Sequence, residues 1–85
     1  MTDFEREVRA LILRALLRAN GPMVDSTLRK LIKNAFSHID FTAGDLGTHI
    51  GGSEEASLIA GTNDDTFGLM WDLTVKGKIK AQQLK

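Results

Sequence analysis

Residues 58–73, with the sequence LIAGTNDDTFGLMWDL, contain the change of hydrophobic period that decides the fold. An apolar stretch over residues 58–62 leads into a segment rich in Asn, Asp and Gly, and a second apolar stretch follows over residues 69–73. Two such stretches around a turn are typical of a β-hairpin. Because side chains alternate along a strand, Trp71 is expected to anchor the hairpin in the core, whereas Phe67 in the turn is expected to be exposed.

Upstream of the hairpin, apolar residues recur at helical spacing. Stripes over residues 4–19 and 28–36 predict two amphipathic helices. The first and third helices are expected to begin at capping boxes, which are formed by Thr2 with Glu5 and by Thr42 with Asp45.

Local residue types indicate where the first helix ends and the second begins. The Asn-Gly-Pro segment 20–22 ends the first helix, with Gly21 expected in the left-handed cap conformation. Residues 23–24 can form a short extended piece. Asp25 or Ser26 is expected to cap the second helix.

The third helix is intrinsically weak because it is rich in glycine. Ile39 and Phe41 are expected to anchor the preceding turn, and Leu46 and Ile50 are the expected inward residues of the helix. Each glycine costs about 1 kcal/mol relative to alanine in a helix. The pattern therefore fits either one strained helix or two short helices, of which the second begins with Ser53 as its cap. The same residues could instead provide a flat surface for close approach of another backbone; they are Gly44, Gly47, Gly51 and Gly52. A last helix is expected from Val75 to about residue 84, with Thr74 as its cap and Val75 and Ile79 on its apolar face.

The composition indicates one domain without disulfides. The 85 residues include 42% hydrophobic and 26% charged side chains and no cysteine, the balance of an ordinary globular protein. A chain of this length has room for one core, so residues 1–85 are expected to form one domain. No apolar stretch is long enough to span a bilayer, and the acidic start is unlike a signal peptide. The expected location is the cytoplasm.

Charge is distributed unevenly along the chain although it sums to zero. Residues 1–33 hold seven basic and four acidic side chains, a net charge of +3. Residues 34–75 hold seven acids and no Lys or Arg, a net charge of −7, and residues 76–85 hold four lysines and no acid, a net charge of +4. The third helix and the hairpin are therefore expected to present an acidic surface.

The order of three helices and a hairpin is that of a winged-helix domain, and the end of the chain adds detail. The segments LIAG at 58–61 and WDLTVKGK at 71–78 resemble the passage of strand, wing, Leu-Thr-x-Lys-Gly and helix in MarR-like and PadR-like bacterial regulators. The chain also resembles small winged-helix proteins of Mu-like bacteriophages. This resemblance covers nearly the whole chain. It implies a winged helix-turn-helix fold, mainly α with a small β-hairpin (α+β), with three helices, a wing and a C-terminal helix.

The resemblance also implies that the third helix enters the major groove of DNA while the wing touches phosphates or the minor groove. The groove-facing residues would be Thr48, His49, Gly52 and Ser53, and the wing tip would be residues 63–67. The chain departs from this pattern where binding would occur. Phosphate contact requires cations that release counterions, and acidic side chains cannot make the common contact between arginine and guanine.

The leading hypothesis is therefore a non-enzymatic adaptor or regulatory module that acts mainly through protein contacts. Its acidic face would meet a basic surface of a partner protein. The candidate contact residues are Asp45, Thr48, His49, Glu54, Glu55, Asp64, Asp65 and Phe67. The alternative is a DNA-binding transcriptional regulator that uses basic residues of the second and last helices, namely Arg29, Lys30, Lys33, Lys76, Lys78 and Lys80.

Leu13 and Leu17 lie on the first helix away from its main apolar stripe. Contact with the C-terminal helix and a homodimer contact explain this leucine pair equally well, and the sequence leaves both open. No enzyme activity, cofactor, metal, membrane association or small-molecule substrate is predicted. The two histidines lack a metal-binding pattern, and neither a nucleophile elbow nor a phosphate-binding loop is present.

Overall fold

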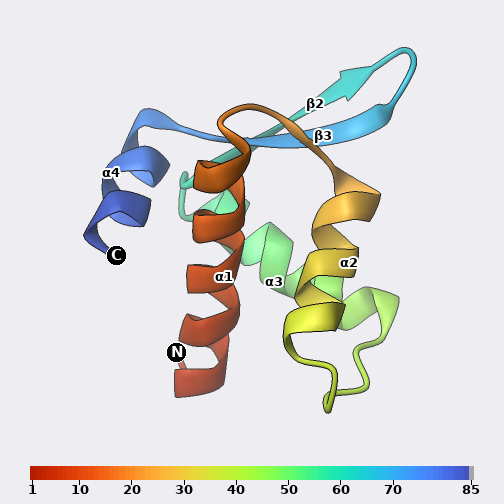
Figure 1. Ribbon diagram of the computed structural model, residues 1–85, viewed down its shortest axis with the longest axis vertical. Coiled ribbons are helices and arrows are strands. Elements are labelled where there is room, and N and C mark those ends of the chain that lie inside the picture. Colours follow the sequence, from red (N-terminus) through yellow and green to blue (C-terminus); the bar gives the residue numbers. More distant parts are fainter. Residues whose placement is uncertain (85) are drawn as a thin grey trace.

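The structure, a computed structural model that describes residues 1–84, contains helices and a small antiparallel sheet (Figure 1). The elements follow in the order α1 (Asp3–Ala19), β1 (Met23–Val24), α2 (Asp25–Ala35), α3 (Ala43–Glu55), β2 (Ile59–Asp64), β3 (Gly68–Leu73) and α4 (Val75–Gln83). The predicted fold class is confirmed: an α+β domain of three helices, a hairpin and a C-terminal helix. Lys85, one of the four C-terminal lysines, lies outside the described residues. Over residues 1–84, no helix has the length and hydropathy needed to cross a membrane.

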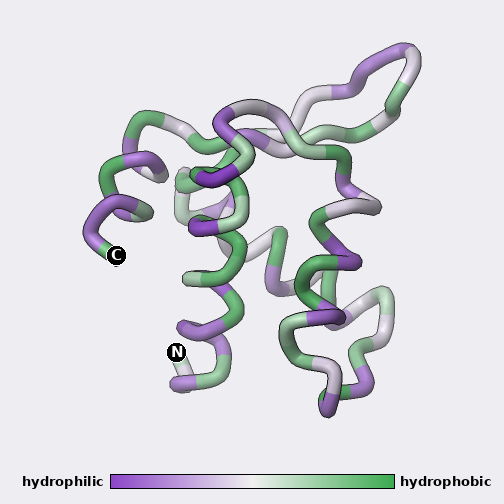
Figure 2. The backbone as a smooth tube through the Cα atoms, in the orientation of Figure 1, coloured by the Kyte–Doolittle hydropathy of each residue, from purple (hydrophilic) through white to green (hydrophobic). Residues whose placement is uncertain are grey.

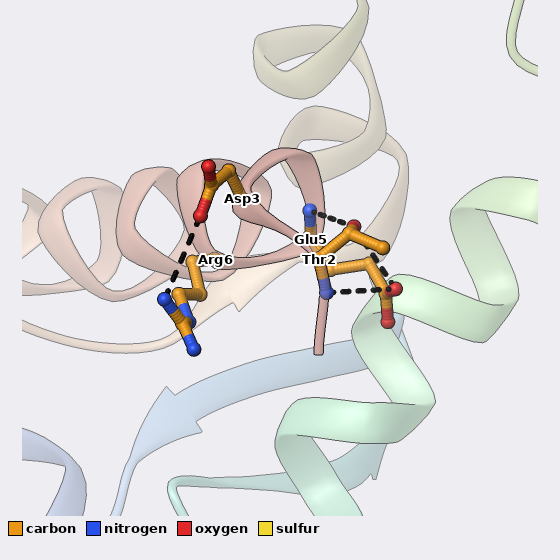
Figure 3. Close-up of polar contacts among 4 residues, drawn as sticks. All are labelled: Thr2, Asp3, Glu5 and Arg6. Atoms are coloured by element: carbon orange, nitrogen blue, oxygen red, sulfur yellow. Dashed lines mark hydrogen bonds and ion pairs between the residues drawn. The ribbon is translucent and has the colours of Figure 1, made fainter.

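Helix α1 begins at the predicted capping box (Figure 3). The Thr2 hydroxyl accepts the backbone N–H of Glu5 at 3.1 Å, and the Glu5 carboxylate accepts the N–H of Thr2 at 3.3 Å. Two backbone donors that a helix start leaves free are thereby satisfied. The ion pair between Asp3 and Arg6 beside it, at 3.6 Å, is exposed and contributes little.

The end of α1 differs from the prediction, because Asn20 rather than Gly21 takes the left-handed conformation. Asn20 has φ 53° and ψ 42°, and its N–H donates to the carbonyls of Leu16 and Leu17. Asparagine tolerates this region better than other side chains do. The cap of α2 was also predicted wrongly. Val24 occupies the N-cap position without a side-chain bond, and Asp25 is already the first helical residue.

Asp25 instead links α2 to the sheet. Its carboxylate accepts the indole N–H of Trp71 at 2.8 Å and the Nε of Arg29 at 2.8 Å. Trp71 is 7% exposed, so the expected core anchor is confirmed, and its polar edge has a partner as a buried indole requires. In the three-stranded sheet, β3 lies between β1 and β2, with Met23 opposite Trp71 and Ile59 opposite Leu73.

The core surrounds α1. The buried residues of α1 (Val8, Ile12, Leu13 and Leu16) pack against side chains of α2, α3 and the sheet, which include Leu28, Ile32, Leu46, Ile50, Ile59 and Leu73. Leu46 and Ile50 are buried as predicted, and so is Phe41, but Ile39 is 37% exposed and does not anchor the turn. Helix α3 is continuous through Gly51 and Gly52, which decides between the two alternatives. Ser53 does not restart a helix; it is fully buried, and its hydroxyl donates to the carbonyl of His49.

Helix α4 packs on α1 through a face that was not predicted. Gly77 and Ala81 are its buried residues, whereas Val75 is 78% and Ile79 54% exposed. A Cβ on Gly77 would overlap the backbone carbonyl of Leu58. The helix therefore approaches the chain before β2 at a distance that only glycine permits, and the apolar pair chosen from the sequence faces away.

Candidate functional site

Helix α3 turns one face to the core and the opposite face outward. Leu46, Ile50 and Ser53 are its buried residues, so 3.6-residue periodicity places the following on the outer face: Gly44, Thr48, Gly51 and Glu55. This face borders an open hollow of about 580 Å³, to which α1 contributes Glu5 and Arg9. The hollow exists because the glycines at this surface have no side chains to fill it.

Cations from outside the acidic stretch border α3 in space. The Nη2 of Arg9 lies 3.2 Å from where a Cβ on Gly52 would be, and the Nη2 of Arg29 lies 3.8 Å from the corresponding position at Gly47. Arg29 also donates to the carbonyl of Ala43 at 3.2 Å. The acidic surface expected from the sequence is therefore only partly correct, because α1 and α2 place a guanidinium group on each side of α3.

A third cation lies at the C-terminal end of α3. Lys76 of α4 donates from its Nζ to the carbonyl of Ala56 at 3.0 Å. The last carbonyls of a helix carry partial negative charge, so an ammonium group is favourable there. Lys76 thus has a structural contact, unlike a lysine that is free to meet a phosphate.

Of the four groove-facing residues implied by the resemblance, Thr48, His49 and Gly52 line the open hollow, and Ser53 does not. Ser53 is buried, and Gly52 is covered by Arg9. His49 is half-buried and packs edge-on against Phe4 and Phe41, with ring centroids 5.8 and 6.0 Å apart. Thr48 is exposed, and its hydroxyl donates back to the carbonyl of Gly44 at 2.9 Å. The implied groove-reading set is therefore wrong for Ser53, and of the four residues Thr48 presents its side chain outward.

Two of the candidate acids have local structural roles. Asp45 accepts the N–H of Thr42 at 3.0 Å in the α3 capping box, and this bond lowers the pKa of its carboxyl. Asp64 accepts the N–H groups of Phe67 and Thr66, at 2.9 and 2.7 Å, and these bonds lower the pKa of its carboxyl. Both carboxylates fix the backbone of their own segment, Asp45 at the start of α3 and Asp64 in the hairpin turn. The capping spacing predicted this role for Asp45, but it was not predicted for Asp64.

The remaining candidate acids are Glu54, Glu55 and Asp65. All are exposed, and within the described part of the chain none forms an ion pair or a hydrogen bond through its side chain. These carboxylates are available to a partner. They come from two places, the end of α3 and the tip of the hairpin.

The hairpin extends beyond the helices as an arm (Figure 1). Every residue of β2 after Ile59 is exposed, as are the first two residues of β3. Phe67 is 63% exposed, which confirms the prediction for this residue, and Leu69 is 37% exposed. Figure 2 shows hydrophilic residues at the tip of the arm, where Asp64 and Asp65 lie.

The candidate basic residues do not gather into one surface. Arg29 is paired with Asp25 at 2.8 Å. Lys30 and Lys33 are exposed on α2, while Lys78 and Lys80 are exposed on α4. Figure 1 shows α2 and α4 on opposite sides of α1. A nucleic acid would therefore have to reach around α1 to meet both groups of lysines on one molecule.

The leucine pair of α1 faces α4. Leu13 is 1% exposed and lines a hollow together with Lys80 and Leu84, and Leu17 is half-buried and lines another together with Lys78, so α4 packs on this side of α1. Contact within one chain therefore accounts for the pair, and Leu13 offers no surface to a second copy. In residues 1–84 there is no group of three or more His, Cys, Asp or Glu side chains arranged to hold a metal ion.

Comparison of the chain with models of protein families, with curated proteins and with solved structures finds no match.

Proposed function

We propose that the protein is a winged-helix-type module that acts by binding protein and has no catalytic role. The order of α1, β1, α2, α3, β2, β3 and α4 supports the winged-helix assignment, with the arm as the wing. The observation that carries the proposal is the outer face of α3. Its residues are two glycines, a threonine and a glutamate, and none offers the Arg, Lys, Asn or Gln side chain with which a recognition helix usually reads bases.

The available charges support a basic protein partner. Glu54, Glu55 and Asp65 are exposed and unpaired within residues 1–84. Complementary charge across an interface accelerates association and selects the partner more than it raises affinity. The exposed ring of Phe67 adds the kind of apolar anchor that dominates binding energy in protein interfaces.

A DNA-binding regulator is the second candidate, because Arg9 borders α3 and the lysines of α2 and α4 are exposed, namely Lys30, Lys33, Lys78 and Lys80. Titration of a labelled DNA duplex at two salt concentrations separates the candidates. A protein making six or more phosphate contacts loses on the order of a thousandfold in affinity between about 50 and 200 mM salt. We expect no binding even at the lower concentration; tight, salt-sensitive binding would overturn the proposal.

Charge reversal locates any binding that is seen. Lys30→Glu/Lys33→Glu and Lys78→Glu/Lys80→Glu alter exposed lysines on α2 and α4 without touching Lys76, whose contact with Ala56 is structural. Neither variant should change the behaviour of a protein-binding module.

The positive test uses a lysine-rich synthetic peptide and the ¹⁵N-labelled protein at low salt. Peptide should shift the amide resonances around Glu54, Glu55 and Asp65, and Glu54→Lys/Glu55→Lys should remove the shifts on α3 while leaving those on the arm. Because Asp64 holds the turn, it is not a suitable position for this reversal. Shifts confined to other surfaces would contradict the assignment of this face.

A further inference from the structure

A groove between α1 and α2 combines an apolar floor with a basic wall. Its volume is about 790 Å³; its floor includes Leu11, Ala15, Met23 and Leu31, and its wall includes Arg14 and Arg18. Leu31 is 38% exposed although it lies on the apolar stripe predicted for the second helix. Neither arginine forms an ion pair within the described chain. The groove is therefore an exposed apolar surface next to two arginines that form no ion pair within residues 1–84.

The tip of the arm has the opposite charge and the matching apolar side chains. Phe67 is 63% and Leu69 37% exposed, and Asp65 beside them is unpaired within residues 1–84. The tip is already ordered. Asp64 accepts two backbone N–H groups, and Gly68 takes a φ of +78° that other residues rarely adopt. A pre-organised tip loses little conformational entropy when it binds.

We propose that the tip of the arm of one molecule docks into the α1–α2 groove of a second copy. Phe67 covers the apolar floor, and Asp65 pairs with Arg14 or Arg18. The arm points away from α1 and α2 (Figure 1), so its tip meets the groove of another molecule and not its own. This inference rests on the proposed protein-binding role of the wing and names the partner that the wing meets.

The contact is between two different surfaces, which decides the forms of assembly. Two copies that exchange arms form a closed dimer with both contacts made, and one-way docking forms a longer chain of copies. Exchange buries two arms per dimer, which brings a small contact closer to the area that a stable interface needs. Either form raises the mass of the particle in solution above that of one chain.

The test is light scattering with sedimentation from micromolar to millimolar protein. The wild type should associate. Phe67→Ser, Asp65→Arg and Arg14→Glu/Arg18→Glu should each weaken association on the order of tenfold or more, the usual cost of removing a central interface side chain. All four positions lie on the surface or at the edge of the groove, and circular dichroism should show unchanged folding.

A mixture provides the sharper result. In a protein carrying Asp65→Arg alone, the new arginine repels Arg14 and Arg18 of the second copy. In a protein carrying Arg14→Glu/Arg18→Glu, the new glutamates repel Asp65, so each variant alone should associate more weakly than the wild type. When the two are mixed, both contacts of an exchanged dimer join opposite charges, and association should return. Val75→Glu/Ile79→Glu is the matched control, because it removes an exposed apolar pair on α4 and should leave association intact.

Three outcomes would overturn the inference: a wild type that stays monomeric at millimolar concentration, a mixture that stays monomeric when the wild type associates, and loss of association in the α4 control. A monomer that also fails to bind DNA leaves the proposed function standing and removes the self-docking alone. Salt-sensitive DNA binding removes the proposed function, whatever the mass of the particle.

Discussion

Replacing Gly77 by alanine sets two physical effects against each other. In an isolated helix the change is favourable by about 1 kcal/mol, because glycine loses more backbone freedom than alanine on becoming helical. In the folded protein the new Cβ would overlap the carbonyl of Leu58 and lie 3.2 Å from the Leu73 side chain. The obstacle at Leu58 is backbone, which cannot rotate away, so α4 has to move away from Leu58.

The steric effect is the larger of the two. Overpacking of a close contact typically costs about 1–3 kcal/mol, which exceeds the helix-propensity gain over most of that range. We expect Gly77→Ala to lower the free energy of unfolding by up to about 2 kcal/mol, because the helix-propensity gain offsets about 1 kcal/mol of the overpacking cost. For a domain of this size each kcal/mol moves Tm by about 4–8 °C.

Gly51→Ala is the matched control. A Cβ at Gly51 meets no atom within 4 Å, so the propensity gain should appear unopposed and stabilise the protein by up to about 1 kcal/mol. Both variants and the wild type are compared by urea unfolding followed by circular dichroism. A Gly77→Ala protein as stable as the Gly51→Ala protein would refute the close approach of α4 to Leu58.

Two further predictions concern carboxylates. Hydrogen bonds from backbone N–H groups lower the folded-state pKa of Glu5, Asp45 and Asp64 below the unfolded values near about 4. The stabilising effect of these carboxylates is therefore present at neutral pH and is lost as the pH falls below about 4. The urea midpoint should drop over this pH range, and the drop should be smaller when the carboxylates are replaced by amides. Asp25→Ala removes the carboxylate that accepts hydrogen bonds from Trp71 and Arg29, so it should lower the free energy of unfolding by about 1–3 kcal/mol and change the tryptophan emission. The control is Asp40→Ala at an exposed position, which should leave the stability nearly unchanged. Equal stability of the two variants would count against the link through Asp25.

The candidate surfaces show where sequence reasoning reaches its limit. Phe67 was identified as exposed because it lies in a turn, and the structure places it at the tip of a projecting arm. Asp64 was counted among the partner-contact acids, although a side chain next to a turn often bonds to backbone two or three residues on, as it does here. The α1–α2 groove was not predicted, because Leu31 and Ala35 follow the same helical period as the buried Leu28 and Ile32. The period alone does not show how much of this apolar stripe the neighbouring helix covers.

Helix starts at Thr2 and Thr42, the hairpin and the buried Trp71 all follow from residues close together in the chain, because capping, turn formation and strand alternation act over a few residues. The buried face of α4 and the charge around α3 depend on partners distant in the sequence, such as Leu58, which is 19 residues from Gly77, and Arg9, which is 43 residues from Gly52. Such partners meet only when the whole chain folds, so a charge count along the sequence makes α3 look more acidic than it is. Long-range packing alone decided which apolar side chains were covered and which stayed exposed.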